Sequence, residues 1–533
     1  MQKKLILSVP SLITLNYFTI FPEYFISISI IYVLIVGIIV TNNVYNFLIQ
    51  SVLSNCIALV LLMTSYLIYN DNLLTVRILT FNNSYVNDFL GSFIKITICF
   101  FSVLYFSTTA SFFKEQKLVS FEYLLLLLFA ILGFFLMCNS NDLLTSYLAI
   151  ELVSFSLYIL AAFKKKSNYS VDSGVKYFVT GAIASALYLF GSSFVYGSTG
   201  SINFSDCYSL CSCFNSYNPE LNLFYVWNVD KYKFFQSAGF WATSSLFNLS
   251  FLEWGLSLIL LSLFIKLALA PFHLWSLDVY EGSPTSSTFF FAVISKISFF
   301  VLLFRLCFYS FFNLKNCWQF YSVLVGFLSV FVGSFGGLTQ RKIKTLLAYS
   351  SVSHMGYSLI SFSIGTFTGF QMLLFYFFAY MTSGFLIWYL FLLIKLKNKH
   401  SRNKYSKELS DLILLKKSNP GVAFSFTLAM FSIAGTPPAI GFFAKACVFL
   451  FVIGASFYLL ALFSILCSVI STFYYIRIIK VLYFEKVLVG KLYHPIQTKK
   501  TVFLSFLVFL TIYFFINPNF LYLISCKSII YFL

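Results

Sequence analysis

The chain has 533 residues, of which 60% are hydrophobic and only 10% are charged. Soluble globular domains carry about 25% charged residues, so this composition excludes a soluble protein and leaves no room for a soluble domain of useful size. The formal net charge of +18 arises from basic residues clustered between apolar runs, which indicates membrane topology and not nucleic-acid binding.

The N-terminal stretch MQKKLILSVP lacks the Arg- and Ser-rich amphipathic character of a transit peptide and has no evident cleavage site. The 70 phenylalanines and 36 tyrosines indicate a gene biased toward AT-rich codons. We therefore predict an organelle-encoded, multi-pass protein of the mitochondrial inner membrane, with a plastid location as the alternative.

At about twenty residues per span and with short connections, the chain accommodates roughly fourteen transmembrane helices. The loops that follow odd-numbered spans carry most of the basic residues, including Lys114, Lys164–Lys166 and the run Lys395–Lys417. The positive-inside rule then places both chain termini on the opposite side of the membrane. The spans are expected near residues 22–40, 52–70, 88–110, 121–138, 141–163, 172–196, 251–275, 284–308, 319–338, 343–363, 368–396, 421–450, 453–478 and 501–516.

These spans predict an all-α polytopic membrane fold with four parts. Residues 1–120 form the first three spans, and residues 479–533 form a C-terminal loop and the last span. Between them we expect two antiporter-like repeats of inverted orientation, each of about five helices. The first repeat covers residues 121–308 and carries a loop insertion at 200–250, and the second covers residues 319–478.

Four charged residues, Glu151, Lys266, Lys296 and Lys445, lie near the centres of long apolar segments. A charge at the middle of a bilayer costs at least ~2.5 kcal/mol, and burial favours the neutral form unless an opposite charge lies nearby. We therefore predict a buried route for protons in which Glu151 pairs with Lys266, Lys296 receives protons through water, and Lys445 exchanges them with one side. The alternative for each residue is a side chain that extends to the membrane interface.

Two spans contain helix breakers at their middles. In FIKLALAPFHLW, Pro271 and His273 follow Lys266. In AGTPPAIGFFAK, Gly435, Pro437 and Pro438 precede Lys445. Proline inside a helix frees carbonyl groups, and broken helices at corresponding positions of two repeats mark ion sites in transporters. A simple packing kink is the alternative for either break.

Two hypotheses are open for each of three further titratable residues in the apolar segments. Lys176 is either an entry point to the charged route or an ion-pair partner of Asp172, one turn away on the same helix. His273 and His354 are either proton relays or hydrogen-bonded structural residues. Lys95 has no evident partner in the sequence, which favours a structural role.

The sequence contains no redox motif. It lacks a Gly-rich dinucleotide fingerprint after a strand and a cysteine set suited to an iron–sulfur cluster. Of the 11 cysteines, most lie in spans, where a thiol behaves as a small hydrophobic group. Cys207, Cys211 and Cys213 cluster in a loop, but their spacing does not match the usual zinc patterns. We therefore predict neither a metal nor a cofactor on this chain.

Six strings between residues 140 and 445 resemble the antiporter-like membrane subunits of proton-pumping NADH–quinone oxidoreductase, respiratory complex I. The string DVYEGSPT at 278–285 is similar to the subunit 2 type, and a lysine at 445 differs from the glutamate of the subunit 4 type. The resemblance implies that the pumping glutamate is Glu151 and that the pumping lysines are Lys176, Lys266, Lys296 and Lys445. The strings cover residues 140–160, 173–200, 264–290, 295–306, 344–357 and 431–445.

The resemblance implies a non-redox subunit of an H⁺-translocating NADH:ubiquinone reductase, driven by quinone reduction in other subunits. FMN, iron–sulfur clusters and ubiquinone are expected in those subunits. The expected partners are lipids and the other membrane subunits, including the neighbouring antiporter-like subunit, and nucleic acid is not among them. The alternatives are an Mrp-type cation/proton antiporter subunit and an assembly scaffold with a vestigial channel.

Overall fold

The computed structural model describes residues 19–40, 46–70, 77–116, 118, 120–215, 244–396, 404–405, 407–413, 415–485 and 493–530. Within these ranges the chain is almost entirely helical, as the sequence predicts. The N-terminal elements are α2 (Phe21–Val40), α3 (Asn46–Tyr69), β1 (Ile78–Thr80), β2 (Tyr85–Asn87) and α4 (Phe89–Glu115). The next are α5 (Phe121–Asn139), α6 (Leu143–Ala161), α7 (Asn168–Thr199), α8 (Phe204–Asn215), α10 (Ser244–Lys266), α11 (Leu274–Gly282), α12 (Thr285–Val293), α13 (Ser295–Phe304), the π-helix η3 (Arg305–Ser310) and the 3₁₀-helix η4 (Phe312–Leu314). The last are α14 (Lys315–Leu338), α15 (Ile343–Ser363), α16 (Phe367–Leu393), β3 (Lys395–Leu396), β4 (Lys404–Tyr405), the 3₁₀-helix η5 (Leu409–Leu412), α17 (Leu415–Ser418), α18 (Pro420–Ala434), α19 (Gly441–Gly454), α20 (Tyr458–Tyr483), α21 (Thr498–Ile516) and α22 (Pro518–Ile530).

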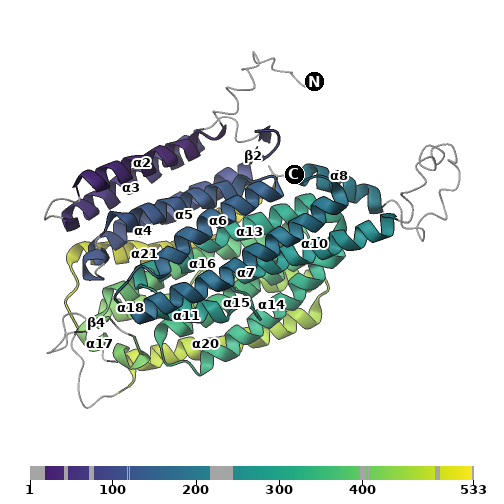
Figure 1. Ribbon diagram of the computed structural model, residues 1–533. Coiled ribbons are helices and arrows are strands. Elements are labelled where there is room, and N and C mark those ends of the chain that lie inside the picture. Colours follow the sequence, from purple (N-terminus) through teal and green to yellow (C-terminus); the bar gives the residue numbers. More distant parts are fainter. Residues whose placement is uncertain are drawn as a thin grey trace, which may run out of the picture.

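The helices form one bundle, with α2 and α3 along one edge and α20 along the opposite edge (Figure 1). Among the described residues, 11 helical segments are long and apolar enough to cross a membrane. The remaining predicted spans correspond to α15 and to the two pairs of shorter helices, α10–α11 and α18–α19. Helices satisfy their own backbone hydrogen bonds, which is why they are suited to lipid.

The bundle has a closed centre and an apolar outer surface. The central stretches of the segment Thr285–Ser310 and of helix α16 are buried, whereas α20 and α21 have mostly exposed faces. Large apolar side chains such as Leu459 and Ile516 point outward from these helices. An outer surface of this kind fits contact with lipid and not with water.

Both predicted helix breaks are present. Helix α10 ends at Lys266, and the chain passes through Ala268 with a positive φ of 57° and a cis peptide before Pro271. Helix α18 ends at Gly435, with φ 79°, and a cis peptide joins Pro437 to Pro438 before α19 begins. Each break therefore divides one span into two half-helices.

The structure differs from the prediction made from the sequence in three details. The span predicted at 284–308 is interrupted at Ile294, between α12 and α13, and continues as the π-helix η3. The expected loop at 200–250 contains helix α8 and the first turns of α10, while residues 216–243 lie outside the described ranges. A small antiparallel hairpin, β1–β2, precedes α4. The division of the chain into inverted repeats stays a prediction.

Candidate functional site

The site begins on α6, where Glu151, Ser154 and Tyr158 share one face because they are three and four residues apart. The Ser154 hydroxyl donates to the backbone carbonyl oxygen of Glu151 at 3.0 Å and lies 3.4 Å from Glu151 Oε2. The second carboxylate oxygen, Glu151 Oε1, is buried and has no hydrogen-bond partner. The face thus carries a row of polar groups that begins at an incompletely satisfied carboxylate.

Lys266 completes this row from α10. Its Nζ donates a hydrogen bond of 2.9 Å to the Tyr158 hydroxyl, and it interacts electrostatically with Glu151. The predicted pairing of Glu151 with Lys266 is an electrostatic interaction and not a direct contact, because no ion pair within 4 Å joins these two described residues. Tyr158 and Ser154 stand between the two charges.

A glycine on α7 makes this arrangement possible. An added Cβ at Gly181 would lie only 1.7 Å from the Tyr158 hydroxyl oxygen. A real Cβ never approaches an oxygen this closely, so any larger residue at 181 displaces the hydroxyl. Gly181 therefore positions Tyr158 against Lys266.

The first helix break supplies polar backbone near Lys266. The indole Nε1 of Trp275 donates to the carbonyl oxygen of Ile265 at 2.9 Å, which satisfies one of the carbonyl groups at the end of α10. Lys266 is the last residue of α10, and the C-terminal end of a helix dipole favours positive charge. His273, just after the break, has a buried Nδ1 with no hydrogen-bond partner.

Lys176 does not pair with Asp172, as one reading of the sequence predicted. Its Nζ lies 2.6 Å from Asp278 Oδ2 on α11, and both side chains are more than half exposed. Exposed ion pairs of this kind contribute little to stability. The structure therefore places Lys176 at the rim of the first broken helix and not beside Glu151.

The second half of the site surrounds His354 on α15. His354 Nδ1 lies 2.6 Å from the Tyr376 hydroxyl, and Tyr475 OH lies 3.4 Å from His354 Nε2. His354 also interacts electrostatically with both Lys296 and Lys445. The imidazole thus lies between two lysines that belong to different spans.

Lys296 and Lys445 flank this histidine. Lys296 Nζ lies 3.5 Å from the Tyr380 hydroxyl, and Lys445 Nζ donates 2.8 Å to the carbonyl oxygen of Ala434, at the end of α18. The absence of a side chain at Gly435 matters here, since an added Cβ would lie 2.6 Å from Lys445 Cδ. Each broken span therefore holds a lysine against the C-terminal end of its first half-helix.

A small cavity of about 10 Å³ lies between His354 and Lys445. This is close to the minimum for one water molecule. Its walls include His354, Tyr376, Tyr380 and Lys445, so a water there would contact protonatable groups from three helices.

No side-chain hydrogen bond among the described residues connects Lys266 with Lys296. The space between them is aromatic: Tyr177 packs against Tyr158 with ring centres 4.7 Å apart and lies 6.2 Å from the ring of Phe291. The predicted passage of a proton between these lysines therefore requires water that enters this layer.

The sequence reading missed the tyrosines and Ser154. Tyrosine is common in apolar spans, so its presence alone does not indicate a functional site. Only the spacing gives a signal, because Ser154 and Tyr158 follow Glu151 at helical intervals. Tyr376 and Tyr380 are likewise one turn apart on α16. No local signal distinguishes these from the other buried tyrosines.

Comparison with known proteins gives consistent results. Residues 140–471 match the family described as NADH:quinone oxidoreductase/Mrp antiporter, TM. The chain is 36% identical over 467 residues to NADH-quinone oxidoreductase subunit N of Pelagibacter ubique, covering 88% of this chain and 89% of that protein. It is 35% identical over 514 residues to NADH-ubiquinone oxidoreductase chain 2 of Marchantia polymorpha, covering 96% of this chain and 97% of that protein.

Two solved structures have similar folds. A chain of respiratory complex I from Thermus thermophilus with bound aureothin matches with a TM-score of 0.72 and 22% identity, covering 94% of this chain and 98% of that chain. A chain of the Mrp complex from Dietzia sp. DQ12-45-1b matches with a TM-score of 0.75 and 16% identity, covering 96% and 97%. At these identities the likeness concerns the fold alone.

Proposed function

Because this chain belongs to the NADH:quinone oxidoreductase/Mrp antiporter family, we propose that it is the proton-translocating membrane subunit of a respiratory NADH–quinone oxidoreductase. Two relatives that match nearly the whole chain carry the names subunit N and chain 2 of that enzyme. The observation that carries the proposal is the buried arrangement in which each broken span holds a lysine among hydroxyl groups and a carboxylate or a histidine.

In the first half of the site, Glu151 responds to a charge or a movement in a neighbouring subunit. Its carboxylate acts on Lys266 through Ser154 and Tyr158, because these hydroxyl groups fill the space between the two charges. When Glu151 moves away, the Lys266 ammonium loses its compensating charge and releases a proton. A difference of one pKa unit corresponds to about 1.4 kcal/mol, so a modest displacement is sufficient.

In the second half, a proton passes from Lys296 to His354 and then to Lys445. Tyr380 and Tyr376 supply hydroxyl groups beside the first lysine and the histidine. Neutral histidine has one nitrogen that accepts and one that donates, which suits it to a position between two lysines. Lys445 then exchanges the proton with one side of the membrane.

The chain itself carries out no redox chemistry in this proposal. FMN, iron–sulfur clusters and ubiquinone are bound by other subunits, and its own partners are lipids and the neighbouring membrane subunits of the complex. We place the protein in the mitochondrial inner membrane, which its codon bias and its Marchantia relative support.

An Mrp-type antiporter subunit is the second candidate function, since a chain of an Mrp complex has the same fold. That likeness rests on 16% identity, whereas the relatives from NADH–quinone oxidoreductases reach 36%. An assembly scaffold with a vestigial channel does not account for the buried, hydrogen-bonded lysines.

The test is purification of the native membrane assembly and identification of its other chains, followed by reconstitution in vesicles. Redox subunits and NADH-driven acidification are expected. An assembly without redox chains that exchanges cations for protons would support the antiporter. Translocation that persists unchanged when Lys266, Lys296 and Lys445 are each replaced by alanine would support the scaffold.

A further inference from the structure

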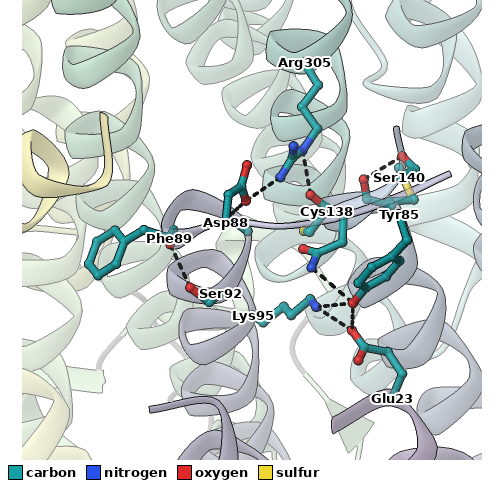
Figure 2. Close-up of polar contacts among 12 residues, drawn as sticks. Glu23, Tyr85, Asp88, Phe89, Ser92, Lys95, Cys138, Ser140 and Arg305 are labelled. Atoms are coloured by element: carbon teal, nitrogen blue, oxygen red, sulfur yellow. Dashed lines mark hydrogen bonds and ion pairs between the residues drawn. The ribbon is translucent and has the colours of Figure 1, made fainter. Parts of the chain in front are cut away.

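A second buried cluster of charged residues lies outside this site, between α2, α4 and the end of α13 (Figure 2). It contains Glu23, Lys95, Asp88 and Arg305, each no more than 4% exposed. Asp88 directly precedes α4, and Lys114 lies near the other end of α4, next to the connection to α5 that we call the Lys114 loop. The cluster therefore lies at the end of the bundle opposite that loop.

The first part of the cluster gives Lys95 the partner that the sequence did not reveal. Lys95 Nζ contacts Glu23 Oε1 and donates to the Tyr85 hydroxyl at 2.8 Å. Tyr85 OH in turn donates to Glu23 Oε1 at 2.7 Å and accepts from Asn139 Nδ2 at 3.1 Å. Tyr85 thus connects a lysine, a carboxylate and an amide, as Figure 2 shows.

The second part of the cluster is an ion pair on the other side of Asn139. Arg305 Nη2 lies 2.7 Å from Asp88 Oδ1, and Arg305 Nε donates to the carbonyl oxygen of Cys138 at 2.7 Å. A Cβ added at Gly91 would lie 2.2 Å from Asn139 Oδ1, 2.8 Å from Asp88 Oδ1 and 3.1 Å from Arg305 Nη2. These three atoms therefore surround one point, and the two parts form a continuous polar cluster.

Three acceptor oxygens of the cluster are left without a donor. Glu23 Oε2, Asp88 Oδ2 and Asn139 Oδ1 are buried and have no hydrogen-bond partner. A buried oxygen without a hydrogen bond destabilises the folded state by about 1–3 kcal/mol. A cluster that only anchored α2–α4 would not require three such oxygens. Each of these oxygens can accept a hydrogen bond from a protonated group or from a protonated water molecule, and the two carboxylates can also bind a proton.

The cluster also shares a helical element with the proton route of the first site. Lys296 and Arg305 belong to one continuous helical element, nine residues or about 14 Å apart at 1.5 Å per residue. The helix changes to a π-helix at Arg305, and π-helical turns occur frequently at functional sites. Arg305 and Lys296 are therefore held at a fixed separation by one helical element.

We propose that this cluster is a second proton-binding site, in which Glu23 and the neighbouring acceptors take up a proton at the end of the bundle opposite the Lys114 loop. With Lys95 and Arg305 protonated and both carboxylates ionised, the cluster is neutral. Uptake of one proton by Glu23 gives it one positive charge, and release of that proton restores neutrality. The inference rests on the proposed function, because the route delivers or removes this proton.

The experiment uses the assembled complex in vesicles with Glu23→Gln, which keeps the shape of the side chain but not its carboxylate. Proton translocation is expected to fall about tenfold, and redox-induced infrared difference spectra are expected to lose a band of a protonated carboxyl group. The control is Ser92→Ala on α4, because the Ser92 hydroxyl donates only to the Phe89 carbonyl oxygen. Both measurements should remain unchanged in this control.

If the Glu23→Gln variant fails to assemble, Tyr85→Phe is the second test variant. It keeps the charges of Glu23 and Lys95 and removes only the hydroxyl that connects them. It should reduce translocation and shift the carboxyl band. Unchanged translocation and an unchanged band in an assembled Glu23→Gln or Tyr85→Phe complex would overturn the inference. Lys266→Ala is measured in the same preparation. If it abolishes translocation while the Glu23 and Tyr85 variants are unaffected, only the second site is refuted. If Lys266→Ala also leaves translocation unchanged, the proposed function itself fails.

Discussion

The Lys266 ammonium donates its hydrogen bond to the Tyr158 hydroxyl at 2.9 Å, and not to a carboxylate. Tyr158 lies on the same helical face as Glu151, with Ser154 between them. The electrostatic influence of Glu151 on Lys266 is therefore exerted across two hydroxyl groups. This arrangement leads to the following predictions for the assembled complex.

Replacement of Lys266 by alanine should reduce proton translocation at least about tenfold, because the first half of the site loses the lysine on which Glu151 acts. Quinone reduction should fall as well if the two processes are tightly coupled. The measurement is NADH-driven acidification of vesicles. Lys165→Ala, in an exposed loop position, is the control, and near-normal pumping by an assembled Lys266 variant would contradict the prediction.

Glu151→Asp should retain part of the activity, whereas Glu151→Gln should lose more. Aspartate keeps the negative charge at a slightly different position, and glutamine keeps the shape without the charge. The measurement is the proton-translocation rate of each variant, normalised to complex content. Equal rates would remove the electrostatic role of this residue.

Tyr158→Phe should lower translocation by about tenfold or more, since a hydrogen bond to a charged group contributes about 1.5–3 kcal/mol. The substitution removes a single oxygen atom and leaves the aromatic packing against Tyr177 in place. Tyr196→Phe on α7, whose side chain is 55% exposed, should have no effect. A Tyr158 variant with the natural rate would show that the hydroxyl does not connect the charges.

Gly181→Ala should reproduce the Tyr158→Phe defect, because the added Cβ would lie 1.7 Å from the Tyr158 hydroxyl oxygen. Gly197→Ala is a matched control on the same helix, where an added Cβ meets no atom within 4 Å. The double variant Gly181→Ala with Tyr158→Phe should be little worse than either single variant. Additive losses would indicate that Gly181 acts through another contact.

Asp142, between α5 and α6, has a carboxyl pKa raised to about 6 by burial and by the nearby Asp206. An unfolded aspartate titrates near about 4, so the stability that this group contributes is present below about pH 4 and is lost as the pH rises through about 6. Asp142→Asn removes this dependence. Its thermal stability relative to the natural chain should increase from about pH 4.5 to about pH 7, by on the order of 1 kcal/mol; a constant difference across that range would refute the assignment.

Much of the fold follows from local properties of the sequence. Apolar runs of spanning length predict the helices, since backbone groups in lipid must be satisfied within the segment. Pro271, Gly435, Pro437 and Pro438 predict both breaks, because proline removes a donor and glycine permits a positive φ. The interruption at Ile294 was missed, since no proline or glycine marks it.

The sequence by itself determined where the spans and the two proline-containing breaks occur and that Lys296 and Lys445 are buried, because the costs of burying a charge and of breaking a helix belong to single residues and their neighbours. Only the tertiary structure decided which groups meet. Lys266 and Tyr158 are 108 residues apart, and Lys95 and Glu23 are 72 residues apart. Contacts of this kind depend on how whole helices pack, and no local pattern of residues encodes them.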